Sequence, residues 1–250
     1  MIPIAICTVD RPEGYLHQTM ANLLASDFGL RPDGRVHLCV GGPQTAYAMR
    51  YEEDQRVTVH RLTEAEWSVM AGERIHTRFT RNYLRCLRLY GPEGIIVLED
   101  DVLLRSDWPR CLDLAREEMD FDGIENYVLA LYYPHQARRS PRGKAYCSYL
   151  ARSFFGTQAI YYPAVAAEMI VEFVEPRIHW KPGDLLLRQW CVENENLYAT
   201  VRPLAQHVGF VSTGLGSIHQ ADGFDLPWPR AEISASGETA APGQSISPQT

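Results

Sequence analysis

The stretch GIIVLEDDVLL, residues 94–104, places three carboxylates at the end of an apolar run. Residues 95–98 have the composition of a buried strand, whereas Glu99, Asp100 and Asp101 require water, a cation or a charged partner. Burying an unpaired carboxylate is costly, so something must receive this charge where the strand ends. It could be a divalent cation, which prefers oxygen ligands, or the triplet could be an acidic turn before a helix capped by Ser106 or Asp107. The triplet alone leaves both hypotheses open.

The segments around this strand alternate between strand and helix patterns. Strands are expected over residues 2–9, 35–42, 56–62, 126–133 and 157–162, and helices over 13–26, 73–90, 107–119, 163–175 and 183–197. This alternation predicts an α/β fold with a mainly parallel central sheet. Ligands of such sheets bind beyond the carboxyl ends of the strands, where the acidic triplet falls. We expect one catalytic domain over residues 1–228 and a disordered tail over 229–250, which is rich in Pro, Ser and Gly.

The composition is that of an ordinary globular protein, with 250 residues, 46% apolar and 22% charged. A formal net charge of −7 argues against general nucleic-acid binding, although a local basic patch stays possible. No apolar run approaches the length of about 18 residues that a membrane span requires, and the N-terminus lacks the basic start of a signal peptide. The six cysteines lie at least 25 residues apart without CxxC pairs. These features predict a cytoplasmic protein with reduced thiols and no transmembrane segment.

Three blocks, in order, resemble the GlcNAc-transferase IV family (glycosyltransferase family 54). TRNYLRCLRLYGPEGIIVLEDDVLLRSDW (80–108) is similar to the segment with the family's Glu-Asp-Asp motif. KPGDLLLRQW (181–190) resembles its Lys-Pro-x-Asp-x-Leu-Leu block, and PLAQHVGFVSTGLG (203–216) its Gln-His-Val-Gly segment. TVDRP (8–12) is similar to the opening of many GT-A glycosyltransferases. The resemblance implies a GT-A, Rossmann-like fold and a metal-dependent glycosyltransferase of the hexosyltransferase type, acting on a nucleoside-diphosphate sugar, with UDP expected.

The resemblance also implies a metal site for Mn²⁺ or Mg²⁺ that bridges the diphosphate of the donor. It makes Asp101 the direct ligand, places Glu99 at the ribose or a metal-bound water, and gives Asp100 a supporting role. His207 matches the late histidine that completes such sites. A satisfied core histidine is the alternative for His207, and His219 is the second candidate for the ligand.

The general base of an inverting transfer is implied at Asp184, in the second block. Such a base takes the proton of the acceptor hydroxyl as that hydroxyl attacks the anomeric carbon directly. The alternative is that Asp184 only caps the helix that starts there. Glu193 and Glu195 follow on the same expected helix and are interpreted as solvated surface charges.

The nucleotide is expected near Thr8, Asp10 and Arg11, which follow the first strand, and near Arg78 and Asn82, which precede the metal strand. Each assignment has a plain alternative. Arg11 could form a salt bridge elsewhere on the surface, and Arg78 belongs to an arginine stripe that could be a solvated helix face.

Gly156 and Gln158 are assigned to the nucleotide-sugar site, in an aromatic stretch on which a sugar could stack or which could be a core strand. The loop 134–149 holds four basic residues and no acidic one, and could close over the diphosphate or an anionic acceptor. The acceptor stays open among a glycan, a lipid-linked sugar, a small molecule, a protein and a modified DNA base. Two rival functions also remain: a metal-dependent phosphohydrolase and a non-catalytic sugar-nucleotide-binding module.

Overall fold

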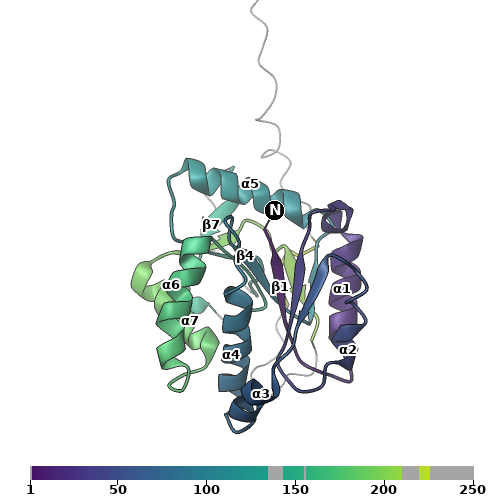
Figure 1. Cartoon of the computed structure of the whole chain (residues 1–250). Coiled ribbons are helices and arrows are strands. Elements are labelled where there is room, and N and C mark those ends of the chain that lie inside the picture. The colour runs from purple at the N-terminus through teal and green to yellow at the C-terminus, as the bar shows by residue number, and fades with distance from the viewer. Residues whose placement is uncertain (1, 135–142, 155, 210–219, 226–250) are drawn as a thin grey trace, which may run out of the picture.

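The computed structural model describes residues 2–134, 143–154, 156–209 and 220–225 (Figure 1). Within these residues, eight strands form one mixed sheet in the order β3-β2-β1-β4-β8-β6-β9-β7, and β10 and β5 form a small antiparallel ribbon. The strands are β1 Ile4–Thr8, β2 Val36–Val40, β3 Val57–His60, β4 Ile95–Glu99, β5 Val102–Leu104, β6 Val128–Ala130, β7 Tyr146–Ser148, β8 Ala159–Tyr162, β9 Leu197–Thr200 and β10 Ala205–His207. The pairings of β1 with β2 and β4, of β2 with β3 and of β6 with β9 are parallel, whereas β8 runs antiparallel to its neighbours.

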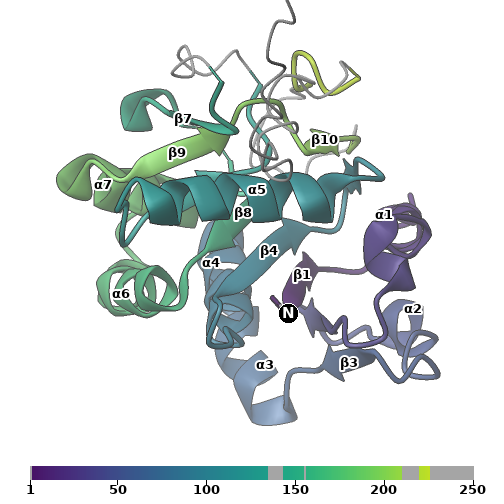
Figure 2. The same ribbon diagram turned by 90° about the horizontal axis from the view of Figure 1, so that it is seen from above.

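Helices cover both faces of the sheet (Figures 1 and 2). On one face, α1 and α5 pack with β1, β2 and β4 into one apolar core, and on the other face α4, α6 and α7 form a second core. The helices are α1 Tyr15–Ala25, α2 Ala46–Met49, α3 Glu64–Ala71, α4 Ile75–Leu87, α5 Trp108–Phe121, α6 Ala164–Val174 and α7 Gly183–Asn194, with short 3-10 turns at Asp27–Leu30, Ala151–Ser153 and Glu175–Arg177. Two covered faces explain why β1 is a continuous apolar run, since all five of its residues are buried.

The register of the sheet brings three distant segments to one edge. Cys7 on β1 lies opposite Glu99 on β4, so the residues that follow both parallel strands emerge side by side. Leu98 lies opposite Ala159, and the Glu99 N–H donates to the Gln158 carbonyl at 2.8 Å, so the start of antiparallel β8 reaches the same edge. Residues 8–11, 99–101 and 156–158 therefore meet there.

At the opposite end of β4, only a glycine fits at position 94. Gly94 has a φ of +97°, and a Cβ built on it would stand 2.0 Å from the Tyr162 carbonyl oxygen. A side chain at this position would be strained and would push β8 away from β4. Gly94 therefore allows the close antiparallel pairing on which the edge described above depends.

The predicted fold class is confirmed: the molecule is an α/β structure with a mixed, mainly parallel central sheet. Several boundaries are wrong. The strand expected over 126–133 is limited to Val128–Ala130, and the helix expected over 73–90 ends at Leu87. The helix expected over 183–197 ends at Asn194, because Glu195 turns the chain with a φ of +51° and β9 begins at Leu197. The sequence analysis also missed short elements, namely α2, α3, β5, β7, β9 and β10.

Some expectations fall partly or wholly outside the described residues: the tail 229–250, His219 and half of the loop 134–149, namely residues 135–142. The assignment of one domain over residues 1–228 stays a prediction. All six cysteines are buried and unpaired, as expected for reduced thiols. In the part of the chain that the structure describes, no helix combines the length and apolar character that crossing a membrane requires.

Candidate functional site

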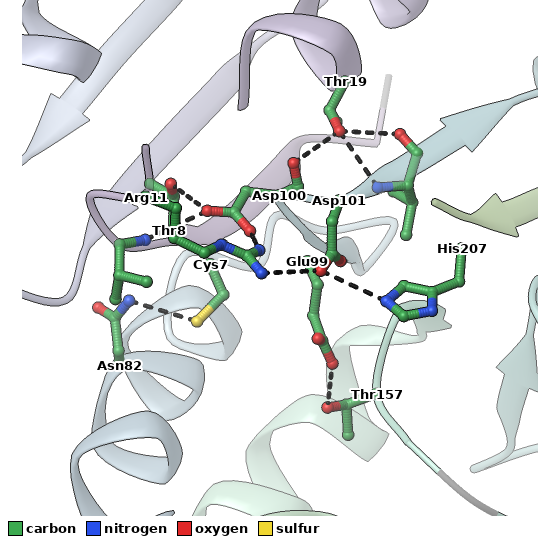
Figure 3. A network of polar contacts seen from close by, with 12 residues as sticks. Cys7, Thr8, Arg11, Thr19, Asn82, Glu99, Asp100, Asp101, Thr157 and His207 are labelled. Atoms are coloured by element: carbon green, nitrogen blue, oxygen red, sulfur yellow. Dashed lines mark hydrogen bonds and ion pairs between the residues drawn. The ribbon is translucent and has the colours of Figure 1, made fainter. Parts of the chain in front are cut away.

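The acidic triplet closes β4 and forms the turn into β5 (Figure 3). Glu99 is the last residue of β4, and Asp100 and Asp101 are the turn residues before Val102. Since β5 separates this turn from α5, the triplet does not cap that helix. Asp107 occupies the N-cap position of α5, as one form of the alternative expected, although its side chain makes no capping hydrogen bond. The carboxylates of the triplet instead contact residues from other elements.

Asp100 joins the turn to the end of β1. Its side chain is buried and accepts hydrogen bonds from the Thr8 hydroxyl at 2.6 Å, from the Val9 N–H at 3.3 Å and from Arg11 Nη2. Hydrogen bonds to an ionised group are the strong ones in proteins. Asp100 therefore ties the β4–β5 turn to the end of β1, and the supporting role at the nucleotide or metal stays a prediction.

Asp101 faces the open space of the site. Its Oδ2 accepts from Arg11 Nη1 at 3.0 Å and lies 3.3 Å from His207 Nε2, while its buried Oδ1 has no hydrogen-bond partner. Burial would raise the pKa of Asp101, but the hydrogen bond with His207 and the charge of Arg11 outweigh it and hold the pKa below its ordinary value. An ionised carboxylate with one unsatisfied buried oxygen is suited to receive a further positive group.

Glu99 has a different electrostatic environment. It accepts a hydrogen bond from the Thr157 hydroxyl at 2.8 Å. Burial, followed by the charge of Asp101, raises the pKa of Glu99 to about 7. A sizeable fraction of Glu99 is therefore protonated at neutral pH, so two neighbouring acids carry different charge.

Thr19 on α1 holds the backbone of the triplet turn. Its hydroxyl lies 2.8 Å from the carbonyl oxygens of Asp100 and Val102 and accepts from the Val102 N–H at 3.2 Å. Asn22, one turn later, receives the Leu104 N–H at 2.6 Å and donates to the Leu104 carbonyl at 3.1 Å. The sequence analysis missed both residues. On an amphipathic helix, a threonine and an asparagine facing a strand carry no sequence signal that separates them from surface residues.

A cavity of about 740 Å³ opens above the triplet, within the range of ligand pockets. All twelve residues that the sequence analysis assigned to the site line it: Thr8, Asp10, Arg11, Arg78, Asn82, Glu99, Asp100, Asp101, Gly156, Gln158, Asp184 and His207. The cavity is also lined by residues that the sequence analysis did not assign, among them Gly41–Gln44 after β2, and Trp67, Ile75, His76 and Phe79 from α3 and the start of α4. The glycine pair after β2 was a usable signal, because that loop leaves the same edge of the sheet.

Arg11 is not a surface residue. Its side chain is 12% exposed and contacts both Asp100 and Asp101, so the hypothesis of a salt bridge elsewhere on the surface is wrong. The guanidinium also packs over the Tyr15 ring, 4.9 Å from its centroid. Arg11 therefore supplies positive charge to the triplet itself.

Asn82 lines the pocket, but its amide is already engaged. Nδ2 donates to the Cys39 carbonyl at 2.8 Å and contacts Cys7 Sγ at 3.3 Å, and Oδ1 accepts from Arg85 Nη1 at 2.8 Å. These contacts tie α4 to the ends of β1 and β2. Arg85 also donates to carbonyls of β2 and of the segment after β3, so the arginine stripe is not a purely solvated face.

Asp184 lies in the first turn of α7, a different element from the one that carries the triplet. The residue at the helix cap is Pro182, so the interpretation of Asp184 as the cap is wrong. The half-buried Asp184 instead lines the cavity. Glu193 is exposed and accepts from Gln189 at 2.8 Å, as expected for a surface charge.

Two glycines shape the pocket next to these groups. A Cβ at Gly209 would stand 2.3 Å from Asp101 Oδ2 and 3.0 Å from His207 Nε2. Gly156 has a φ of +79°, and a Cβ there would meet Gln158 Oε1 at 2.1 Å. Side chains at either position would displace polar groups of the site.

The side chains around Asp101 include donor atoms that a hard cation accepts, although they do not form a complete coordination sphere. Among the described residues, no group of three or more His, Cys, Asp or Glu side chains is arranged as metal ligands. Asp101, His207 and Glu99 nevertheless offer carboxylate and imidazole donors, and Asp101 Oδ1 is buried and unsatisfied. The residues present therefore fit Mn²⁺ or Mg²⁺, with Arg11 placed where it competes for Asp101.

Sheet topology and the site at its carboxyl edge define this molecule as having the GT-A glycosyltransferase fold. Glycosyltransferase GlyE of Streptococcus pneumoniae TIGR4 matches 87% of this chain and 57% of its own, with 10% identity and a TM-score of 0.50. The galactosyltransferase LgtC, solved with donor and acceptor sugar analogues, matches 76% of this chain and 70% of its own, with 15% identity and a TM-score of 0.46. TarS of S. aureus matches 80% of this chain and 58% of its own, with 14% identity and a TM-score of 0.45.

The similarity to the GlyE structure, at a TM-score of 0.50, shows the fold alone. No family model matches the sequence. No curated protein matches it either. The chain spans 57% of the GlyE structure, and 44% of the apo form of that protein.

Proposed function

We propose that this protein is a metal-dependent, inverting glycosyltransferase that moves a hexose from a UDP-sugar to a hydroxyl acceptor, in keeping with the resemblance of its sequence blocks to glycosyltransferase family 54. One observation carries the proposal. A single pocket at the carboxyl edge of the sheet is lined both by the acidic triplet, at the end of β4, and by a separate carboxylate, Asp184, from the first turn of α7. The reaction needs both: charge neutralisation on the leaving diphosphate and a base beside the acceptor.

The negative charge of the side chains that line the pocket supports the binding of a cation. Five carboxylates line it, and the guanidiniums that line it are those of Arg11 and Arg78. A nucleotide diphosphate adds further negative charge, and Arg11 already neutralises part of the triplet. Diphosphate binding therefore depends on an additional positive charge.

Asp101 and His207 would hold the ion, with Glu99 beside them. Bound Mn²⁺ or Mg²⁺ would act as a Lewis acid and neutralise the charge that develops on the leaving diphosphate. The protein's own contribution is to keep Asp101 ionised through His207 and Arg11 and to fix its backbone through Thr19. Gly209 leaves the approach to Asp101 clear.

Asp184 would serve the acceptor. Its carboxylate takes the hydroxyl proton while the acceptor oxygen forms a bond to the anomeric carbon and the bond from that carbon to the diphosphate oxygen breaks. Displacement in one step inverts the anomeric configuration and releases UDP. Asp184 is half-buried in the first turn of α7 and lines the same pocket as the triplet, which supports this role.

Two rival functions predict different results. A two-metal phosphohydrolase would require carboxylates grouped to hold two ions, and the described residues show no such group. A binding module would use the triplet and would not depend on Asp184. Hydrolysis of a panel of UDP-sugars and of phosphoesters with Mn²⁺ separates the three functions, since slow UDP-sugar hydrolysis is the background reaction of a transferase without its acceptor.

Two variants test the assigned roles. Asp101→Ala should abolish Mn²⁺-dependent UDP binding in calorimetry. Asp184→Asn should lower kcat by about 100-fold or more, on the scale of general-base catalysis, and leave UDP affinity within a few-fold. Glu193→Gln, on the same helix but at the surface, is the matched control and should keep full activity. Near-normal turnover in Asp184→Asn, or a product that retains the donor's configuration, would contradict the assignment.

A further inference from the structure

Arg11 occupies an unusual position between the two aspartates of the triplet (Figure 3). It follows β1 and reaches across to the β4–β5 turn, donating through Nη2 to Asp100 Oδ1 and through Nη1 to Asp101 Oδ2 at 3.0 Å. The three side chains are 12%, 4% and 6% exposed. Two buried adjacent carboxylates would repel each other strongly without this guanidinium.

We propose that Arg11 is an exchangeable counter-cation: it neutralises Asp100 and Asp101 in the nucleotide-free protein, leaves Asp101 when a divalent ion binds there, and then holds the diphosphate. This inference rests on the proposed metal-dependent function. In this inference Arg11 has two partners in succession: first the Asp101 carboxylate of the protein, and then the diphosphate of the nucleotide. The arginine thereby links the binding of the ion to the binding of the nucleotide.

The position of the guanidinium at Asp101 conflicts with a bound ion. Arg11 Nη1 and His207 Nε2 both approach the same oxygen, Asp101 Oδ2. A divalent ion held by Asp101 and His207 would stand beside the guanidinium, where two positive charges repel each other in a poorly solvated site.

The contacts of Arg11 also leave it a way to move. Arg11 Nε is buried without a hydrogen-bond partner, and its guanidinium packs on the ring of Tyr15. It can therefore give up Asp101 while it keeps Asp100 and the aromatic contact. Nη1, with its two N–H groups, then becomes a donor at the wall of the pocket that is available to phosphate oxygens.

Ion and nucleotide binding are consequently coupled. The ion displaces the guanidinium from Asp101, and the guanidinium then donates to the diphosphate. Each ligand thereby lowers the free-energy cost of moving Arg11 when the other ligand binds. Such coupling is reciprocal by thermodynamic linkage. A purely structural salt bridge would behave differently, because its loss would lower the affinity of the protein for both the ion and the nucleotide.

The test compares Mn²⁺ binding to nucleotide-free wild type and Arg11→Gln, followed by the electron paramagnetic resonance of free Mn²⁺. We expect the variant to bind Mn²⁺ alone at least about tenfold more tightly, since a competing charge is removed. With Mn²⁺ saturating, calorimetry should show UDP binding at least about tenfold weaker than in wild type, since the phosphate donor is gone. Arg78→Gln removes an equal charge from the same pocket, from a guanidinium that packs on the Trp67 ring, and should change Mn²⁺ affinity much less.

A second variant separates this exchange from net charge and from failure to fold. Arg11→Gln combined with Asp100→Asn removes the guanidinium together with one of its carboxylate partners, so the net charge of the site is unchanged. This double variant should still bind Mn²⁺ alone more tightly than wild type. Mn²⁺ should also raise its melting temperature more than that of wild type, because an ion that binds only the folded state stabilises it.

The possible outcomes distinguish a failure of the Arg11 exchange from a failure of the proposed metal-dependent function. If wild type binds neither Mn²⁺ nor UDP with Mn²⁺, the proposed function fails and the inference falls with it. If wild type binds UDP with Mn²⁺ but neither variant gains Mn²⁺ affinity, the function stands and the exchange is overturned. An equal gain in Arg78→Gln also overturns it, because the effect would then be the general charge of the pocket.

Discussion

Replacing Thr19 by valine tests whether α1 holds the triplet turn. Thr19 is 1% exposed, and its hydroxyl makes three close contacts with the backbone of Asp100 and Val102, at 2.8, 2.8 and 3.2 Å. Valine has nearly the same shape, so Thr19→Val removes these hydrogen bonds without opening a cavity. The effect on stability then measures the polar contacts alone.

The magnitude follows from the number of groups left unsatisfied. The hydroxyl has one proton to donate and accepts one N–H, so the variant loses two hydrogen bonds to buried backbone groups. Each buried group left without a partner costs about 1–3 kcal/mol, which gives about 2–6 kcal/mol for the pair. For a chain of 250 residues this corresponds to a fall in melting temperature of roughly 4–24 °C.

Thr19→Ser is the matched control. It keeps the hydroxyl and removes one buried methyl group, at a cost of about 1 kcal/mol. Urea unfolding followed by circular dichroism should therefore rank wild type above Thr19→Ser and Thr19→Ser above Thr19→Val. A valine variant within about 0.5 kcal/mol of wild type, or a serine variant as unstable as valine, would refute the argument that the hydroxyl fixes this turn.

Two further predictions follow from single positions. Gly209→Ala should weaken Mn²⁺ binding, because its Cβ would stand 2.3 Å from Asp101 Oδ2, whereas Gly42→Ala, with nothing within 4 Å, should leave it unchanged in the same titration. Glu73→Gln should destabilise the fold at pH 7 by about 0.5–1 kcal/mol, since Arg81 binds Glu73 through two nitrogens at the partly exposed start of α4. Hydrogen bonding to Arg81 lowers the pKa of Glu73, so this stabilisation exists above the ordinary pKa of 4.5 and should vanish in urea titrations as the pH falls below it.

The longer elements could be predicted because their signals are local. The apolar run of β4 and the helical spacing of α1, α4 and α5 depend on neighbouring residues, and the structure places those elements close to their predicted bounds. Short elements such as β9 and β10 lack this signal, because three or four residues cannot establish a period. The end of α7 depends on one left-handed residue, Glu195, which is not a glycine and so gave no warning.

The acidic triplet could be predicted from local sequence, but its partners could not. Thr157 and Glu99 are 58 positions apart, and Thr19 lies 81 positions from Asp100. Such contacts depend on which strands are neighbours and in what register they pair. The family resemblance pointed to His207 and Asp184, and it gave no indication that Arg11 would contact two of the acids.

Strand order explains why the pocket forms where it does. β4 has a parallel neighbour, β1, and an antiparallel neighbour, β8, so the exits of two strands and the entrance of a third share one edge. The exit of β1 supplies Thr8 and Arg11, and the entrance of β8 supplies Thr157. If β8 ran parallel to β4, Thr157 would lie at the far end of the sheet and Glu99 would lose its hydroxyl partner. The change from parallel to antiparallel pairing at β4 is therefore what surrounds the triplet with partners on both sides, and the candidate site is a consequence of the sheet's topology.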